Sequence, residues 1–233
     1  GGGGGGDPEP PPANDSSQLN SVQQAASSVA AQLSSEFITD STGNAVSDAL
    51  SGQIQVLSAS EGKVGLQWAP GLRSGATRIT PTADVPGDLT SDSSLRFWLD
   101  GRYTDWNSAG LDGDQFNGLA GVSLLTGNGM VAGLAIGYED SDYDTVTGAA
   151  LEGEGFSAGL YAGGTLSGNF RFDAQVHGAI LDYDVRSGAV TGEFDATRLV
   201  ASAGLSHLWT LGPFTIEPTL RATGTWEWQD GYV

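Results

Sequence analysis

Cysteine is absent from the 233-residue sequence, and histidine and methionine are rare, with two residues and one residue respectively. The absence of cysteine excludes disulfide bonds and thiolate metal sites. Basic residues are also scarce, because 9 Lys and Arg stand against 28 Asp and Glu, and the formal net charge is −19. Since phosphate backbones are bound through basic patches, nucleic acid is not an expected partner.

No apolar run reaches the length of a transmembrane helix, about 18 residues, and this excludes a helical membrane anchor. The chain instead contains 36 glycines, together with 8 Phe, 6 Trp and 6 Tyr, beside a hydrophobic share of only 39%. Such a composition suits β-structure that buries every second side chain. It is also compatible with a membrane β-barrel, whose sequence signal is weak in each strand.

The segment 170–183 alternates like a β-strand with two different faces. One face carries Phe170, Phe172, Ala174, Val176, Gly178 and Ile180, and the other carries Arg171, Asp173, Gln175, His177 and Ala179. Strands of soluble proteins are usually about five or six residues long, whereas a tilted strand that crosses a bilayer needs about nine to eleven. The length therefore favours a membrane strand whose apolar face meets lipid.

Segments of this kind follow one another through the second half of the chain. They cover residues 95–106, 116–126, 130–144, 155–166, 170–185, 193–211 and 214–228. Short turns at 126–129, 167–169 and 211–213 alternate with polar segments at 107–115, 145–154 and 186–192, for which we expect long loops. Short turns on one side and long loops on the other are typical of outer-membrane barrels. The sequence thus predicts an all-β fold with an N-terminal helical segment, an antiparallel up-and-down membrane β-barrel of which this chain holds about seven strands.

The residues before these strands divide into three parts. Residues 1–16 form a Gly/Pro-rich linker, residues 17–57 a helical segment and residues 58–92 an irregular connector, and residues 93–233 hold the barrel strands. Apolar residues recur in the helical segment at three- and four-residue steps, the period of a helix. The apolar stripe is thin and rich in alanine, so it suits either a narrow, partly wet channel or an ordinary helix on a sheet surface.

The sequence carries none of the common catalytic or metal-binding motifs. The two histidines, His177 and His207, lie far apart and have no nucleophile signature near them. Acidic residues cluster at 139–144, and calcium prefers oxygen ligands, but the glycine and distal glutamate of an EF-hand loop are missing. A solvated external loop is the alternative for these acids. We expect no enzyme activity, no cofactor and no metal site.

Charged residues on the polar faces of the strands are the best candidates for a functional site. Charges of both signs could pair across neighbouring strands and hold a helix or a chain inside a pore. In a soluble sheet the same residues would form an ordinary wet face. The candidates are Arg96, Asp100, Arg102, Arg171, Asp173, Arg198, Glu217, Arg221 and Glu227.

Four segments, 97–101, 117–144, 155–164 and 217–228, carry a resemblance to a known family. In order and spacing they resemble the translocator (β) domain of type V secretion autotransporters. The resemblance implies a helix inside a twelve-stranded barrel in the outer membrane of a Gram-negative bacterium, where it anchors and exports an N-terminal passenger. The implied partners are outer-membrane lipid, the chain's own passenger and the barrel-assembly machinery.

The chain departs from the family pattern in its strand count. It has about seven strands, and the family's terminal strand with its C-terminal aromatic residue is not present, so we expect a chain that is truncated or completed by other chains. Self-cleavage, known in some family members, is not carried over, because no matching asparagine motif is found. The alternative function is a soluble or surface-exposed β-domain that acts as an adhesin or binding module.

Overall fold

The computed structural model describes residues 15–51, 72–73, 82–85, 94–108, 110–166, 169–211, 214–216 and 218–231. Most of the predicted linker 1–16 and most of the predicted connector 58–92 therefore lie outside the described residues. One long helix and one large antiparallel sheet make up the described part of the chain.

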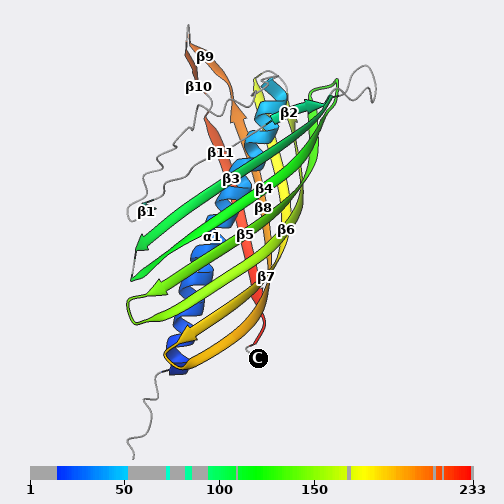
Figure 1. The fold of residues 1–233 in the computed structure, drawn as a ribbon. Helices are drawn as coiled ribbons and strands as arrows, with labels where there is room; N and C mark the ends of the chain where they lie inside the picture. Colours follow the sequence, from blue (N-terminus) through cyan, green and yellow to red (C-terminus); the bar gives the residue numbers. More distant parts are fainter. Residues whose placement is uncertain are drawn as a thin grey trace, which may run out of the picture.

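The sheet is built from seven long strands that pair in chain order (Figure 1). They are β3 (Ser94–Ser108), β4 (Leu111–Leu125), β5 (Met130–Thr145), β6 (Ala149–Thr165), β7 (Phe170–Ser187), β8 (Val190–His207) and β11 (Thr219–Gln229). Two short strands, β1 (Leu72–Arg73) and β2 (Thr82–Val85), pair with the free side of β3. The strands β9 (Trp209–Leu211) and β10 (Phe214–Ile216) form a separate hairpin between β8 and β11.

The sheet curls around the helix α1 (Asp15–Ser51), which contacts each of the seven long strands (Figure 1). Its concave face therefore surrounds the helix, and its convex face looks outward. Within the described residues β11 pairs only with β8, so the sheet is an open half-barrel. The predicted fold class, an antiparallel membrane β-barrel with an N-terminal helical segment and seven strands, is confirmed as a partial barrel.

The prediction of long loops at 107–115, 145–154 and 186–192 was wrong. These residues continue the strands, and the connections are tight turns in which Gly110, Gly148 and Gly188 adopt positive φ angles of 80°, 81° and 61°. Polar composition indicated loops, but the polar residues still alternate with apolar ones. The pleat therefore continues through them, and the strands reach 15 to 18 residues.

Two further boundaries differ from the prediction. The predicted strands 193–211 and 214–228 are interrupted, because β8 ends at His207 and the β9–β10 hairpin intervenes before β11. The helix begins at Asp15, two residues before the predicted segment 17–57, and continues without a break to Ser51. At 1.5 Å per residue its 37 residues span about 55 Å, enough to run from one end of the sheet to the other.

The convex face carries an apolar belt across all seven strands. In β7 the belt extends from Phe170 to Ile180, about 33 Å along the strand, or about 25 Å across a bilayer at the usual barrel tilt. That is the height of the apolar band of outer-membrane barrels. Exposed members of the belt include Phe97, Leu99, Leu124, Met130, Leu134, Ile136, Phe156, Leu160, Phe170, Val176, Ile180, Leu205, Leu220, Trp226 and Trp228.

Candidate functional site

The helix runs along the concave face, and the two ends of the sheet differ in composition. We call the end with the β3–β4, β5–β6 and β7–β8 turns the acidic end, and the opposite end the hairpin end. The first turns of α1 lie at the acidic end, where Val22 packs in one cluster with Leu111 and Val185 (Figure 1). The last turns lie toward the hairpin end, where the Asp48 carbonyl accepts a hydrogen bond from Arg96 Nη1 at 3.0 Å.

At the acidic end the convex face bears an acidic rim. Register places carboxylates directly opposite one another on adjacent strands, as in the row Asp114, Asp142 and Glu152. Arg186 is a basic residue that alternates with them on this face. The rim consists of Asp105, Asp112, Asp114, Asp140, Asp142, Asp144, Glu152, Glu154, Asp182, Asp184, Glu193 and Asp195.

Behind the acidic rim the concave face is apolar. Where the belt ends, the apolar side chains of the strands therefore change from the convex to the concave face, and the charged side chains lie on the convex face. The buried side chains there enclose the first half of the helix, and we call this region the apolar chamber. Its ring pair Tyr183–Phe194 stacks with centroids 5.0 Å apart. The chamber is formed by Val22, Ala26, Ala30, Leu111, Tyr143, Ala149, Leu151, Ala179, Leu181, Tyr183, Val185, Phe194 and Ala196.

At the level of the belt the concave face carries polar side chains that bond to the helix, beside a second cluster of buried apolar side chains. The Ser34 hydroxyl donates to Asn117 Oδ1 at 2.8 Å and accepts from Gln115 Nε2 at 2.7 Å. Thr42 donates to the side-chain carbonyl of Gln175 on the opposite wall. A small-residue helix with polar contacts on several sides fits a narrow channel of mixed polarity, in which side-chain hydrogen bonds replace water at the polar contacts.

Three predicted site residues on β3 contact the second half of the helix. Asp100 is 2% exposed and accepts a hydrogen bond from the Ser41 hydroxyl at 2.7 Å. Arg102 pairs with Asp40 at 2.9 Å, and its guanidinium lies 5.3 Å from the centre of the Phe37 ring. Together with Arg96, they bring both charge signs to one side of the helix.

On the opposite side Arg221 of β11 joins the sheet to the helix. Its Nη2 pairs with Asp173 of β7 at 3.0 Å, and its Nη1 donates to the Thr39 carbonyl at 3.2 Å. Arg171 is half-buried near the hairpin end. Glu217, the remaining candidate of this group, lies outside the described residues.

The remaining two candidates, Arg198 and Glu227, belong to a buried charge cluster. Arg198 is 1% exposed, and its Nη1 donates to both Glu139 oxygens at 2.8 and 2.9 Å. Its Nε pairs with Glu227 at 2.8 Å, and its Nη2 donates to the Tyr183 hydroxyl at 2.9 Å. The cluster joins β5, β7, β8 and β11 across the curve of the sheet.

Sequence reasoning missed Glu139 and Tyr183 as members of this cluster. Glu139 was grouped with the acids 139–144, although it alternates with Asp140 and therefore lies on the opposite face. This parity is the signal that separates the concave glutamate from the acidic rim. No sequence signal shows that Glu139 and Arg198 meet, because β6 and β7 lie between their strands.

In the described part of the chain no group of three or more His, Asp or Glu side chains is placed to hold a metal ion. His177 is 1% exposed and neither ring nitrogen has a hydrogen-bond partner in the structure, so no neighbour activates it or is activated by it. What the concave face can do is bind a helix through matched polar and apolar contacts.

The acidic rim makes stability depend on pH. Partial burial raises the pKa of the Asp142 carboxyl, and the charges of Glu152, Asp144, Asp114 and Asp140 raise it further. Because the folded pKa is raised, the destabilisation is absent below the unfolded pKa of about 3.9 and grows as pH rises through the folded pKa. We expect Asp142→Asn to raise the unfolding free energy at pH 7 by up to about 1 kcal/mol.

Urea unfolding in lipid vesicles at pH 4 and pH 7 checks this expectation. The gain from Asp142→Asn should shrink at the lower pH and in high salt, which screens the rim. Glu36→Gln, on an exposed helix position away from the rim, is the matched control. An equal gain from both variants, or a gain that grows toward pH 4, contradicts the assignment.

A curved sheet with a belt of bilayer height outside and a bound helix inside defines an outer-membrane β-barrel domain. The family model of the autotransporter beta-domain matches residues 97–233, and the chain belongs to this family. The resemblance expected from the sequence is thereby confirmed. No curated protein and no solved structure matches the chain. Among the described helical residues, none form a helix apolar and long enough to cross a membrane.

Membership gives the apolar belt its environment, since domains of this family lie in the outer membrane of Gram-negative bacteria. Val176 lies near the middle of the belt and is 45% exposed. We expect Val176→Arg to destabilise the folded state in vesicles by about 2–4 kcal/mol, because the guanidinium would meet hydrocarbon. Asp184→Arg, on the acidic rim of the same strand, is the control and should not destabilise the folded state, because its register partners are Glu152 and Glu193. Equal effects in vesicle unfolding would contradict the belt.

Proposed function

We propose that this chain is a translocator domain that anchors an N-terminal passenger in the outer membrane and exports it. The observation that carries the proposal is the course of α1, which lies along the concave face from the acidic end toward the hairpin end (Figure 1). A helix held this way connects the two sides of the membrane through the inside of the sheet. The family is one of translocators rather than enzymes.

The direction of the helix assigns the two ends. A passenger precedes α1 in the chain, so it would be joined at the acidic end, and this end would face the cell surface. The hairpin end would then face the periplasm. Carboxylates on strand ends that extend beyond the belt are well suited to water outside the bilayer. The partners in this function are the outer-membrane lipid, the passenger and the barrel-assembly machinery.

Contacts around the helix support a role in holding rather than releasing it. Glycine at position 163 allows a close approach of β6 to the helix, because a Cβ there would collide with the Val46 side chain. Hydrogen bonds reach the helix from β3, β4, β7 and β11. The sheet therefore contacts the helix along its length. Such contacts would hold the helix in place while it anchors a surface passenger.

Surface display of a reporter tests the proposal. A folded reporter domain fused before residue 1 should become accessible to protease and antibody on intact cells when the chain is expressed with an export signal. Ala30→Pro, which breaks the helix inside the apolar chamber, should reduce display severalfold. Retention of the wild-type reporter in the periplasm, with the sheet folded in the outer membrane, would contradict export by this domain.

A further inference from the structure

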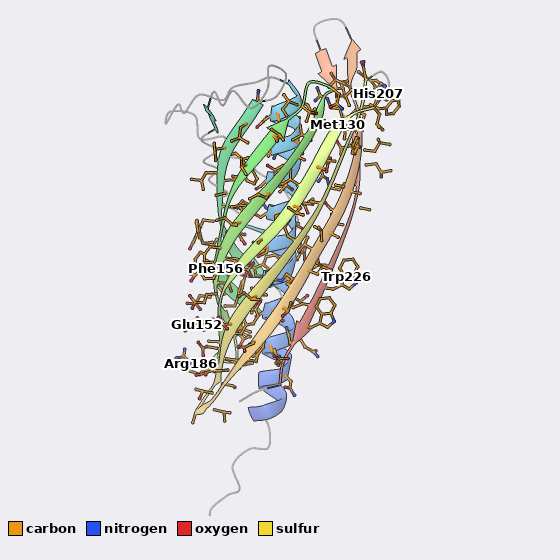
Figure 2. All side chains as sticks on the ribbon, turned by 90° about the vertical axis from the view of Figure 1, so that its right-hand side faces the viewer. Met130, Glu152, Phe156, Arg186, His207 and Trp226 are labelled. Carbon is orange, nitrogen blue, oxygen red and sulfur yellow. The ribbon has the colours of Figure 1, made fainter. Side chains whose placement is uncertain are left out.

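Two short strands from the segment before β3 lie on the free edge of β3, one toward each end of it. β2 pairs with residues 95–98 and β1 with residues 105–106, and both pairings are antiparallel. The β2 pairing lies at the end of the sheet that Met130 marks in Figure 2, and the β1 pairing lies at the end that Glu152 marks. We call β1 and β2 together the edge strap.

At the hairpin end the residues of β2 agree with the two faces of β3. Ala83 is the register partner of Phe97, which belongs to the apolar belt on the convex face. Asp84 is the register partner of Arg96, a buried residue of the concave face. An apolar residue thus stands in the row of the belt and an acidic residue beside a basic one, and both combinations favour strand pairing.

The agreement continues at the acidic end, where the two faces of β3 have exchanged their polarity. Leu72 is the register partner of Trp106, which packs against the apolar chamber. Arg73 is the register partner of Asp105 in the acidic rim. Because a slip of one residue would move every residue of the edge strap to the wrong face, the agreement at both ends indicates that the sequence specifies this register.

The edge strap nevertheless holds β3 less completely than a long strand does. β1 and β2 give β3 two and four register partners, whereas β4 gives it fifteen, one for each of its residues. The two short ladders are also in different registers: residues 74–81 separate Arg73 from Thr82, but only residues 99–104 separate their partners. The connector side is two residues longer, so one unbroken ladder cannot join the two pairings.

The change of register falls at the level of the apolar belt. Leu99, a belt residue that is 48% exposed, lies on β3 between the two pairings. In hydrocarbon an unpaired N–H or C=O has no water to bond to, so a barrel strand needs a complete ladder on each edge. Outside the membrane water satisfies such groups, but a free edge there invites pairing with another chain. The edge strap therefore suits the sheet before insertion better than the sheet in lipid.

We propose that the edge strap is an autoinhibitory contact, which covers the β3 edge before insertion and is displaced by the strand that closes the barrel. The two compete because a closing strand must pair with the same residues, 95–98 and 105–106, that the edge strap pairs with. In the bilayer the closing strand prevails, since its complete ladder leaves no backbone group of β3 unpaired. This proposal rests on closure of the barrel and not on the export of a passenger.

Disulfide trapping tests the proposal on the full chain, whose sequence contains no other cysteine. Ala83→Cys with Phe97→Cys would tie the edge strap to β3, because the Cα atoms of antiparallel partners lie about 4.5–5.5 Å apart, within the range of a disulfide. We expect this disulfide to form under mild oxidation before vesicles are added. The oxidised chain should then gain the heat-dependent gel mobility of a closed barrel at least about tenfold more slowly than the reduced chain.

Phe97→Cys with Val122→Cys is the matched control, since it ties β3 to β4 and leaves the edge strap free. Its oxidised and reduced forms should insert at the same rate. A disulfide in the control but not in the Ala83→Cys pair would show that the edge strap does not cover β3. Equal insertion of the oxidised and reduced Ala83→Cys pair, or equal slowing of the control by oxidation, would show that closure displaces no strap.

Two further observations complete the test. If Phe97→Cys prevents folding, Val85→Cys with Leu95→Cys gives the strap disulfide and Leu95→Cys with Leu124→Cys gives its control. Failure of the reduced chain to acquire the closed-barrel mobility would leave no closure to inhibit, and would also overturn the proposal. Display of a passenger reporter is measured separately, so a failure of export leaves these outcomes unchanged.

Discussion

Replacement of Arg198 by alanine is expected to destabilise the sheet by about 3–5 kcal/mol, the largest effect of any single substitution considered for this chain. The guanidinium is 1% exposed, and its two glutamate partners are 9% and 11% exposed. Without Arg198, Glu139 and Glu227 would face each other as buried charges with no cation between them. The Tyr183 hydroxyl would lose its partner as well.

Urea unfolding in vesicles and heat-dependent gel mobility measure the effect. Arg102→Ala is the matched control, because the Arg102–Asp40 pair is 19% and 46% exposed and such pairs contribute at most about 1 kcal/mol. A triple variant, Arg198→Met with Glu139→Gln and Glu227→Gln, should recover part of the loss by removing the unpaired charges. If Arg198→Ala loses no more stability than Arg102→Ala, the cluster does not hold the curve of the sheet.

The second large effect is expected at Leu181, in the apolar chamber. Leu181 is 2% exposed, and its truncation to alanine leaves a cavity beside the helix that the surrounding strands fill only in part. Large-to-small substitutions of this kind cost about 2–5 kcal/mol. The same variant should loosen the first half of α1, which hydrogen exchange of the helix amides would show as reduced protection.

The neighbouring residue supplies the control. Ile180 is 68% exposed on the convex face, so Ile180→Ala removes contact with lipid and opens no internal cavity. Its cost should be clearly smaller than that of Leu181→Ala, and helix protection should not change. Equal costs at the two positions would mean that the sidedness of the strand does not invert at this point.

Alternation within single strands could be read directly from the sequence. In β7 the two faces assigned from the pattern are the two faces observed, with Val176 and Ile180 outside and Gln175 and His177 buried. The pattern was informative because successive side chains of a strand point to opposite faces, and a shift of one residue would have moved every side chain to the other face. It failed at 145–154, where a change in composition was interpreted as a change in secondary structure. In the strand ends beyond the belt the apolar residues face the concave side and the polar residues the convex side, although the alternation itself continues.

Contacts between distant strands could not be predicted in the same way. Taken together, the polar faces of the strands carry charges of both signs, and this indicated pairing without naming the partners. The pairing of Arg198 with Glu139 depends on the curvature of four neighbouring strands, a property of the whole sheet. Likewise Arg221 reaches the helix only because β11 follows β8 around the curve. No local spacing in the sequence encodes either distance.

The acidic rim has a consequence for how the sheet enters and stays in a membrane. A charged side chain at the bilayer centre costs roughly 2.5–3.5 kcal/mol even on the scale that gives the lowest values. The acidic rim holds many such side chains. A sheet that inserts with this end leading must carry the acidic rim through the hydrocarbon once, either assisted by other proteins or with its carboxylates transiently neutralised. After insertion the same barrier opposes the return. The rim therefore keeps the inserted sheet in one orientation through a kinetic barrier to its return. This barrier does not depend on the equilibrium stability of the folded sheet.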